Sequence, residues 1–227
     1  MLEDITGAIF DMDGTLTDTM YIWMTTGSLY LKSKGIEGDG AFDDMKISTM
    51  TLPAASEYFK ERYGIDATPE QISDDINKLT EKEYFEKSVL KPGVLDFLTA
   101  LKDHGVKMCV ATTTDRYLAE GCLKRVGIRD FFGAVFTSTE VGSGKQSPEI
   151  FFQARDFLGT PTESTYVFED SYYAVQGAKK GGFPVVGVYD ISNSRYARNG
   201  IVMPDAMIEA CDVYVDRLND IVINWKE

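Results

Sequence analysis

The sequence predicts an α/β protein with a parallel sheet at its core and a separate helical segment inserted near the start. Short apolar runs rich in Val, Ile and Phe alternate with helical patterns through the second half of the chain. Such alternation favours a parallel sheet covered by helices on both faces. Roughly 90 residues separate the first apolar run from the second, and they hold no convincing strand.

The individual elements follow from these patterns. Residues 5–10, 106–111, 134–137, 165–168 and 184–189 are each expected to form a buried strand. Helical periodicity covers residues 117–126, 148–158 and 172–181, with Gly127 and Gly181 or Gly182 as C-terminal stops.

Residues 17–90 are expected to form the inserted helical module. The stretches 20–34, 52–63 and 69–90 have helical spacing, whereas 35–40 and 63–69 are expected to be loops. Lys91-Pro92-Gly93 marks the return to the sheet. We therefore predict a core domain of residues 1–16 and 91–227 and a helical domain of residues 17–90.

Composition narrows the possible partners. The 227 residues are 44% hydrophobic and carry a net charge of −13, which disfavours nucleic acid and anionic lipid. Glu3 and Asp4 stand where a secretory signal would be basic, and the longest apolar run, 183–189, is too short to cross a bilayer. We expect a soluble, cytoplasmic protein with no membrane or nucleic-acid partner. The oligomeric state stays open, and a monomer is compatible with the sequence.

The cysteines and the single histidine exclude several kinds of chemistry. Cys109, Cys122 and Cys211 form no zinc-binding pattern and are expected to be reduced core thiols. His104 lies just before Gly105, where a helix is expected to end, so we interpret it as a solvated helix-end residue. One histidine also excludes zinc and dinuclear sites that need two or more.

The strongest local signal is the segment Ile9-Phe10-Asp11-Met12-Asp13-Gly14-Thr15-Leu16. It places two carboxylates directly after a buried strand, at the edge of a parallel sheet where ligands bind. Carboxylates flanked by apolar residues are costly unless they are paired or bind a metal, and Mg²⁺ prefers oxygen ligands. A plain Asp-Gly turn with solvated side chains remains the alternative.

Three later segments also place polar groups after expected strands, although each has a structural alternative. Thr112-Thr113-Thr114 could bind phosphate oxygens or cap the helix that follows. Lys145 follows a glycine loop and could equally be a surface charge. Glu169-Asp170 could bind a metal or cap a helix.

Taken together and in this order, the four segments resemble the motifs of the haloacid dehalogenase superfamily. The helical insertion, Glu169-Asp170-Ser171 and Lys145-Gln146-Ser147-Pro148-Glu149-Ile150-Phe151 are most similar to the subgroup of β-phosphoglucomutase and phosphoglycolate-type phosphatases. The resemblance covers nearly the whole chain. It implies a Rossmann-like parallel sheet core with an inserted all-α cap domain.

The resemblance also implies a role for each motif residue. Asp11 would attack phosphorus and form an aspartyl-phosphate, while Asp13 would be the general acid and then the general base. Mg²⁺ would be held by Asp11, the backbone carbonyl of Asp13 and Asp170, with Glu169 adjacent or in the surrounding layer. The transferring phosphoryl group would be held by Thr112, the backbone amide of Thr113 and Lys145.

The expected activity is that of a magnesium-dependent phosphatase for a small phosphorylated metabolite. A sugar phosphomutase of the β-phosphoglucomutase type is the first alternative, but Trp23 stands where that subgroup has a histidine. The segment 45–53 has no arginine for a second phosphate, although Lys46 could substitute, and Gln146-Ser147 departs from the usual third motif. A non-catalytic interaction protein on the same scaffold is the second alternative. Cap-side candidates for substrate contact are Tyr21, Trp23, Met24 and residues 46–52, each of which could instead be cap core.

Overall fold

The computed structural model describes residues 1–47, 50–192 and 204–225. A six-stranded sheet in the order β4-β3-β2-β5-β6-β7 lies at its centre, and each neighbouring pair is parallel. The predicted α/β class is confirmed. The strands of the sheet are β2 (Gly7–Phe10), β3 (Lys107–Thr112), β4 (Val135–Thr137), β5 (Thr165–Glu169), β6 (Val185–Val188) and β7 (Val213–Val215), and β1 (Leu2–Glu3) pairs separately with β8 (Ile223–Asn224).

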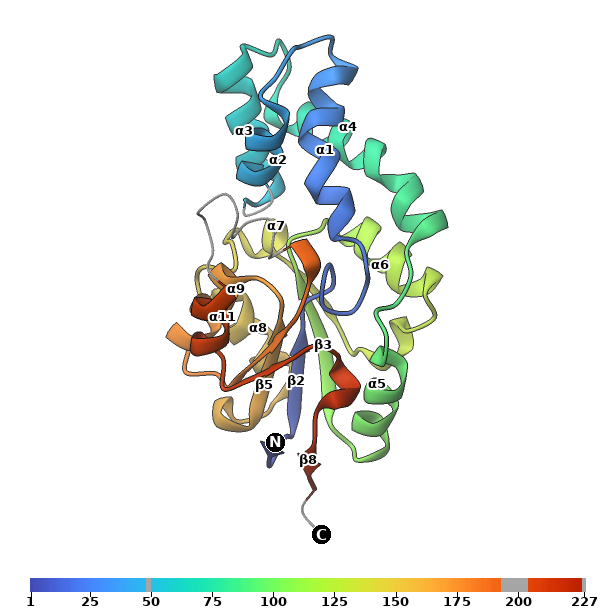
Figure 1. Ribbon diagram of the computed structural model, residues 1–227, viewed down its shortest axis with the longest axis vertical. Helices are drawn as coiled ribbons and strands as arrows, with labels where there is room; N and C mark the ends of the chain where they lie inside the picture. The colour runs from blue at the N-terminus through green and yellow to red at the C-terminus, as the bar shows by residue number, and fades with distance from the viewer. Residues whose placement is uncertain (48–49, 193–203, 226–227) are drawn as a thin grey trace.

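Helices cover both faces of this sheet (Figure 1). Alternate residues of β2 point to opposite faces, as the two-residue repeat of a strand requires. Phe10 packs in a cluster with residues of α5 (Val94–Asp103) and α6 (Arg116–Arg125), whereas Ile9 packs with residues of α8 (Glu149–Leu158) and α9 (Tyr172–Lys180). The helices of this part are α5 (Val94–Asp103), α6 (Arg116–Arg125), α7 (Ser138–Val141), α8 (Glu149–Leu158), α9 (Tyr172–Lys180) and α11 (Pro204–Ala210), with single 3₁₀ turns η2 (Arg129–Phe131), η3 (Thr162–Ser164) and η4 (Leu218–Asp220).

Strand β2 lies in the interior of the sheet, between β3 and β5, and this position places the site. It pairs with β3 on one side and β5 on the other, so Ile9 lies opposite both Cys109 and Val167. All four residues of β2 are buried. The residues that follow β2 are therefore delivered to the middle of the sheet edge, where the chain order of the strands reverses and ligands bind in parallel sheets.

The inserted helices stand above the carboxyl edge of the sheet, at the top of Figure 1. They enclose their own apolar cluster, in which Tyr30, Phe59 and Ile76 are almost fully buried. The two connecting segments run side by side, because Thr17 pairs with Leu90 and the Asp18 amide donates to the Val89 carbonyl. The cap helices are α1 (Met20–Ser33), α2 (Gly40–Ile47), α3 (Leu52–Tyr63) and α4 (Pro69–Lys82), followed by the π-helical turn η1 (Glu83–Lys87).

Two features of the cap differ from the sequence prediction. The sequence predicts no helix over α2, which is held by tertiary bonds: Tyr58 and Tyr63 both donate to Asp43, and Ser28 donates to Asp44. The helix expected over 69–90 ends at Lys82 and gives way to η1, so the prediction was wrong for its last residues. The local sequence pattern predicts neither α2 nor the change from α4 to η1, because both depend on contacts with distant segments.

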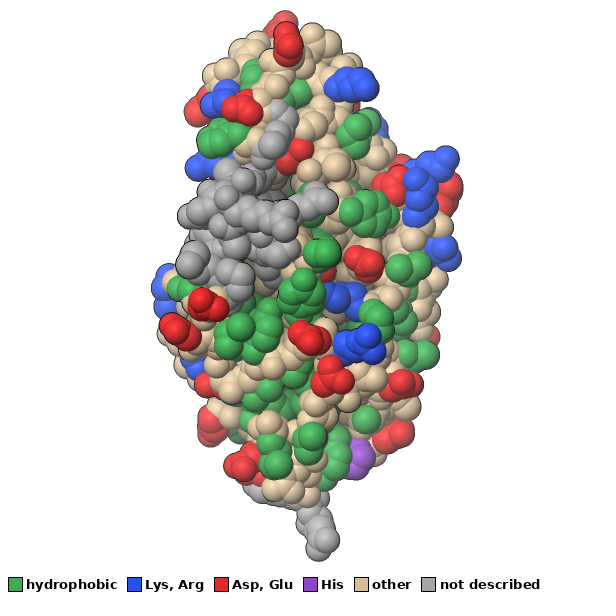
Figure 2. Space-filling view, viewed as in Figure 1, with side chains coloured by type: hydrophobic (Ala, Val, Ile, Leu, Met, Phe, Trp, Pro, Cys, Tyr) green, Lys and Arg blue, Asp and Glu red, His purple; other side chains and the backbone are tan. Residues whose placement is uncertain are grey.

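The cysteines and the histidine are predicted to be core thiols and a helix-end residue. All three cysteines are free thiols, but only Cys109 and Cys122 are buried; Cys211 is partly exposed, so the prediction of a core position was wrong for it. His104 is exposed at the end of α5, and its ring stacks on Trp225 with 3.7 Å between centroids. Figure 2 shows acidic and basic side chains interspersed over the visible face. None of the helices in the described parts of the chain is long and apolar enough to cross a membrane.

Candidate active site

A lysine and three carboxylates from three segments of the chain meet directly above β2. The Lys145 ammonium donates to Oδ1 of Asp11, which follows β2, and to Oε1 of Glu169 at the end of β5, the latter at 2.6 Å. Lys145 is 1% exposed. Burial lowers the pKa of the Lys145 ammonium, but the Asp11 and Glu169 carboxylates outweigh it and hold the pKa above its usual range. The lysine is therefore a permanent positive charge beside Asp11.

Asp170 completes an acidic cluster with Asp11 and Glu169. One carboxylate oxygen from each of the three lies within 4.8 Å of the others, and all three side chains are buried. Burial raises the pKa of Asp170, and the charges of Asp11 and Glu169 raise it further. Burial also raises the pKa of Glu169 against the opposing effect of Lys145. Three close carboxylates with one ammonium leave excess negative charge, which a cation would offset.

This donor set fits a magnesium ion. Mg²⁺ takes oxygen ligands and is usually bound through one or two carboxylates in phosphoryl-transfer sites. Asp11 and Asp170 offer such oxygens within a few ångströms of each other, with Glu169 beside them. Thr15 donates to Oδ1 of Asp170 at 3.2 Å and orients that carboxyl group. Three of the four residues predicted to hold the metal, Asp11, Glu169 and Asp170, are therefore brought together, and the role of the Asp13 backbone carbonyl stays a prediction.

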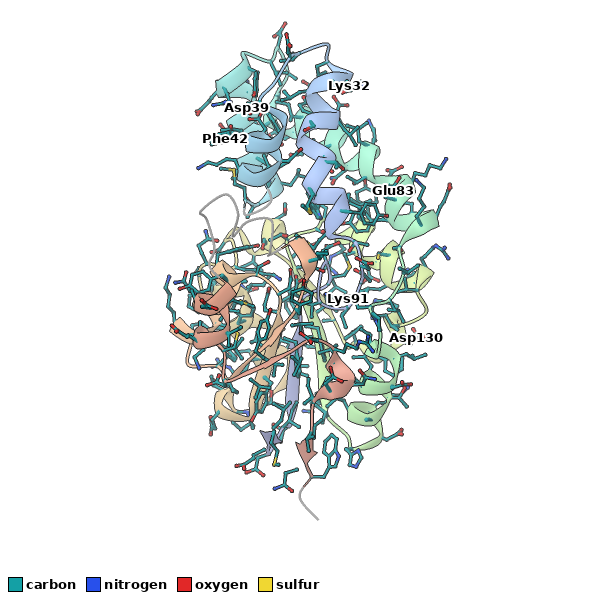
Figure 3. All side chains as sticks on the ribbon, in the orientation of Figure 1. Lys32, Asp39, Phe42, Glu83, Lys91 and Asp130 are labelled. Atoms are coloured by element: carbon teal, nitrogen blue, oxygen red, sulfur yellow. The ribbon has the colours of Figure 1, made fainter. Side chains whose placement is uncertain are left out.

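The turn that follows β2 and lies beside the Asp170 carboxylate requires glycine at position 14. Gly14 has φ +90°, and a Cβ there would lie 2.5 Å from Oδ2 of Asp170. Lys91 holds the same turn from the other side, because its ammonium donates to the Gly14 carbonyl at 2.5 Å and to Asp190 at 3.0 Å. Figure 3 shows Lys91 between the cap and the end of the sheet. The tight turn after β2 is thus fixed by steric fit and by a partly buried lysine.

Asp13 lies in a different environment, among hydroxyl groups. Its Oδ1 accepts hydrogen bonds from Thr19 at 2.5 Å and Tyr84 at 2.7 Å, and its Oδ2 accepts one from Thr114 at 2.7 Å. Burial and the charge of Asp11 raise the pKa of Asp13 to about 6, against the effect of the three hydrogen bonds. A carboxyl group with that pKa can both donate and accept a proton near neutral pH.

The three threonines at the end of β3, Thr112, Thr113 and Thr114, have different environments. Thr113 lines a cavity above Asp11 and Asp13. Thr112 is fully buried, and its hydroxyl accepts a hydrogen bond from the Thr114 amide at 3.1 Å. Sequence reasoning chose Thr112 and Thr113 and missed Thr114, whose hydroxyl contacts Asp13. Thr112 and Thr113 lie at the predicted edge of the sheet, and their phosphate-binding role stays a prediction.

The cavity has polar residues on its core side and apolar residues on its cap side. Water-sized molecules have about 30 Å³ of free space in it, which is room for roughly one or two waters. The core side is formed by Asp11, Asp13, Thr113, Ser171 and Tyr173. The cap side is formed by Met20, Trp23, Ile47, Met50, Leu52, Ala55 and Ile76.

Only some of the cap-side candidates line this cavity. Trp23 and several residues of 46–52 do so, whereas Tyr21 is 44% exposed and donates to Glu83. Met24 is half-buried and Lys46 is exposed. Ser48 and Thr49, which belong to the predicted segment, lie outside the described residues.

Two residues important for the site carry no recognisable sequence signal. Tyr84 is completely buried and bonds to Asp13 across 71 positions of sequence. Gly177 in α9 lies against the loop of Lys145, because a Cβ on it would come within 1.9 Å of the Lys145 carbonyl oxygen. A tyrosine in a helical pattern and a glycine in a helix are both common, so only the three-dimensional arrangement reveals these contacts.

The fold and the buried acidic cluster define a class of α/β enzymes. In this class the acidic residues follow the strands of a parallel sheet and lie beneath a helical cap. Comparison with known proteins identifies the family. Residues 5–182 match the model of the haloacid dehalogenase-like hydrolases. The chain therefore belongs to this family, and the resemblance found in its sequence is confirmed.

Individual relatives are similar over most of their length. The chain is 29% identical to a phosphorylated carbohydrates phosphatase of Thermotoga maritima, over 82% of this chain and 85% of the relative. It is 28% identical to the fructose-1-phosphate phosphatase YqaB of Escherichia coli, over 83% and 98%. Among solved structures, CbbY from Rhodobacter sphaeroides in complex with phosphate has the same fold, with TM-score 0.81, 19% identity and coverage of 96% and 97%.

Proposed function

We propose that this hydrolase is a magnesium-dependent phosphatase for a small phosphorylated metabolite and works through an aspartyl-phosphate. The observation that carries the proposal is the buried contact of Lys145 with both Asp11 and Glu169 beside Asp170, beneath the cavity. Two relatives named as phosphatases of phosphorylated carbohydrates and fructose 1-phosphate support the reaction type.

In the first step, a carboxylate oxygen of Asp11 attacks phosphorus while the bond from phosphorus to the leaving oxygen breaks. Asp13 gives its proton to that oxygen, so the product leaves as a neutral alcohol. In the second step, Asp13 takes a proton from water, and the water oxygen attacks phosphorus. Inorganic phosphate departs, and Asp11 is restored as a free carboxylate.

The charged residues stabilise the transferring group. Lys145 holds Asp11 in place and offsets negative charge on the phosphoryl oxygens, with Thr112 and the backbone amide of Thr113 as hydrogen-bond donors. Asp11, Asp170 and the backbone carbonyl of Asp13 would hold Mg²⁺, with Glu169 adjacent. When bound, the cation supplies charge neutralisation that lets an anionic phosphate approach a carboxylate.

The helical cap admits and selects the leaving group. We assign residues 17–90 to this cap and residues 1–16 and 91–227 to the core. The cavity has room for only roughly one or two waters, so we infer that the cap helices move away before a phosphorylated metabolite enters. Its lining favours a compact leaving group with apolar surface.

The mutase alternative receives less support. A mutase has to bind a second phosphate from the cap side, and the described cap residues that line the cavity are apolar. Trp23 contacts the cavity in the place that the subgroup gives to a histidine. A non-catalytic scaffold is disfavoured because Asp11, Lys145 and the pair Glu169–Asp170, from three motifs, converge on one buried cluster.

Phosphate release from p-nitrophenyl phosphate, measured with Mg²⁺ and with EDTA, tests the proposal. We expect release that depends on Mg²⁺ and is lost in Asp11→Asn. A chelator-insensitive rate equal to that of Asp11→Asn would refute enzymatic activity. Incubation of β-glucose 1-phosphate with a bisphosphate primer separates the alternatives, because glucose 6-phosphate without free phosphate would identify a mutase.

A further inference from the structure

Tyr84 connects the cap side of the cavity to Asp13. It lies in η1, the π-helical turn through which the cap returns to the core, and its side chain is completely buried. Its hydroxyl contacts Asp13 Oδ1 at 2.7 Å, Thr114 Oγ1 at 3.2 Å and the indole nitrogen of Trp23 at 2.8 Å. Glu83, the neighbouring residue in η1, is labelled in Figure 3 on the segment that descends from the cap.

The donors and acceptors of this network can be assigned from chemistry alone. An indole N–H only donates, so the Tyr84 oxygen must accept a hydrogen bond from Trp23. A tyrosine hydroxyl has an ordinary pKa of about 10, so the Tyr84 hydroxyl carries one proton to donate. That single proton points to Asp13 or to Thr114. Trp23 thus restricts the directions in which the Tyr84 hydroxyl can donate.

The same network limits how Asp13 can be oriented. Thr19 and Tyr84 donate to one carboxylate oxygen and Thr114 donates to the other, so both oxygens are held. Thr19 also contacts the Thr17 hydroxyl at 2.8 Å and can turn its proton away when Asp13 is protonated. Tyr84 is stiffer, because its ring is buried and Trp23 occupies its oxygen.

We propose that Tyr84 is a positioning residue for Asp13 and that Trp23 fixes the direction of the Tyr84 hydroxyl. The proposal rests on the function proposed above, in which Asp13 protonates the leaving oxygen. Trp23 and Asp13 both line the cavity. Trp23, which contacts the leaving group on the cap side, thereby orients Asp13, the acid that protonates the leaving oxygen, through Tyr84.

The dependence of the rate on the leaving group tests this role. An alcohol needs a proton as it leaves, whereas p-nitrophenolate leaves without one. kcat/KM covers all steps up to departure of the leaving group. For Tyr84→Phe, we expect kcat/KM to fall about 10- to 100-fold with glycerol 2-phosphate and less than about threefold with p-nitrophenyl phosphate. The larger loss is part of the roughly 10²- to 10⁴-fold rate increase that a positioned general acid contributes.

Two further variants separate positioning from a structural effect. Trp23→Phe, which removes the indole N–H, should give a smaller loss with the same selectivity for the alkyl ester. In an Asp13→Asn background, Tyr84→Phe should lower kcat/KM no further, because the acid is already absent. Tyr117→Phe is the matched control, since Tyr117 donates to Glu81 of the cap at 3.1 Å without contacting Asp13.

The outcomes are distinguishable from those of the function test. If the wild-type protein releases no phosphate from either ester, the proposed function fails. If the wild-type protein is active but Tyr84→Phe loses equal activity on both esters, or none, the positioning role is wrong. The same holds if Tyr117→Phe reproduces the selective loss, or if Tyr84→Phe and Asp13→Asn have independent effects.

Discussion

Gly177 offers a sharp test of how α9 places Lys145. An ideal Cβ at position 177 would lie 1.9 Å from the Lys145 carbonyl oxygen, 2.9 Å from its carbonyl carbon and 3.0 Å from the Gln146 carbonyl carbon. Non-bonded heavy atoms sit comfortably at about 3.5 Å, so Gly177→Ala has to push this backbone away by roughly 1.5 Å. The obstacle is backbone, so rotation of a side chain cannot relieve it.

The expected effect on activity is large because the displaced residue is Lys145. A misplacement of about 1 Å in a catalytic group can cost roughly 10²-fold, so we expect kcat/KM with p-nitrophenyl phosphate to fall by about that factor. The effect on stability is smaller. Alanine favours a helix interior over glycine by about 1 kcal/mol, whereas overpacking costs about 1–3 kcal/mol. The net loss should be about 0–2 kcal/mol.

Steady-state kinetics with Mg²⁺ and thermal unfolding of the same preparation measure both effects. Gln176→Ala is the matched control, because Gln176 is exposed on the neighbouring position of α9. It should leave kcat/KM within about twofold of the wild-type value, since surface substitutions away from special features have small effects. A folded Gly177→Ala protein with wild-type kcat/KM would show that α9 does not position Lys145.

Three further predictions concern the carboxylates. Lys145→Met should lower kcat/KM by at least about 10²-fold. The control Lys179→Met removes an exposed ion pair with Asp212 and should change the free energy of unfolding by less than about 1 kcal/mol. Equal effects of the two substitutions on kcat/KM would contradict the role of Lys145 in stabilising the phosphoryl group. Gly14→Ala should abolish magnesium-dependent activity, because the turn needs a positive φ and has no room for Cβ beside Asp170; normal kinetics would exclude that constraint. In metal-free protein, burial raises the pKa of Asp13 from 3.8 to about 6. The protonated carboxyl group therefore stabilises the folded state by about 3 kcal/mol below about pH 4, and this contribution is lost as the pH rises through 6. Asp170 and Glu169 shift in the same direction, so the rise in Tm caused by Mg²⁺ should be larger at pH 8 than at pH 5, and a rise independent of pH would contradict this.

The strand ends could be predicted from sequence because their signal is local. Asp11 and Glu169 each follow a short apolar run, and parallel strands bring such ends to one edge of a sheet. Lys145 was identified by its motif, and the structure places its ammonium against both carboxylates. The order of the segments along the chain was enough to place them together.

The residues that surround Asp13 could not be predicted in the same way. Tyr84 reaches Asp13 only because the helix expected over 69–90 changes to a π-helical turn, which no local pattern indicates. Thr114 is the third of three threonines, and only the path of the chain after β3 decides which hydroxyl contacts Asp13. Likewise, α2 depends on the buried contacts of Asp43 with two tyrosines from α3.

The contrast between Asp11 and Asp13 shows why the motif alone does not assign their roles. The two residues are chemically identical and two positions apart, yet Asp11 faces a lysine ammonium and Asp13 faces three neutral hydroxyl groups. A carboxylate held by a lysine ammonium is positioned to attack phosphorus. A carboxyl group buried among neutral donors, with its pKa raised to about 6, can exchange a proton near neutral pH. The hydroxyls come from α1's cap position, η1 and the loop after β3, so the acid–base character of Asp13 depends on segments of both the cap and the core. A change in how the cap packs on the core would therefore alter proton transfer before it altered the nucleophile.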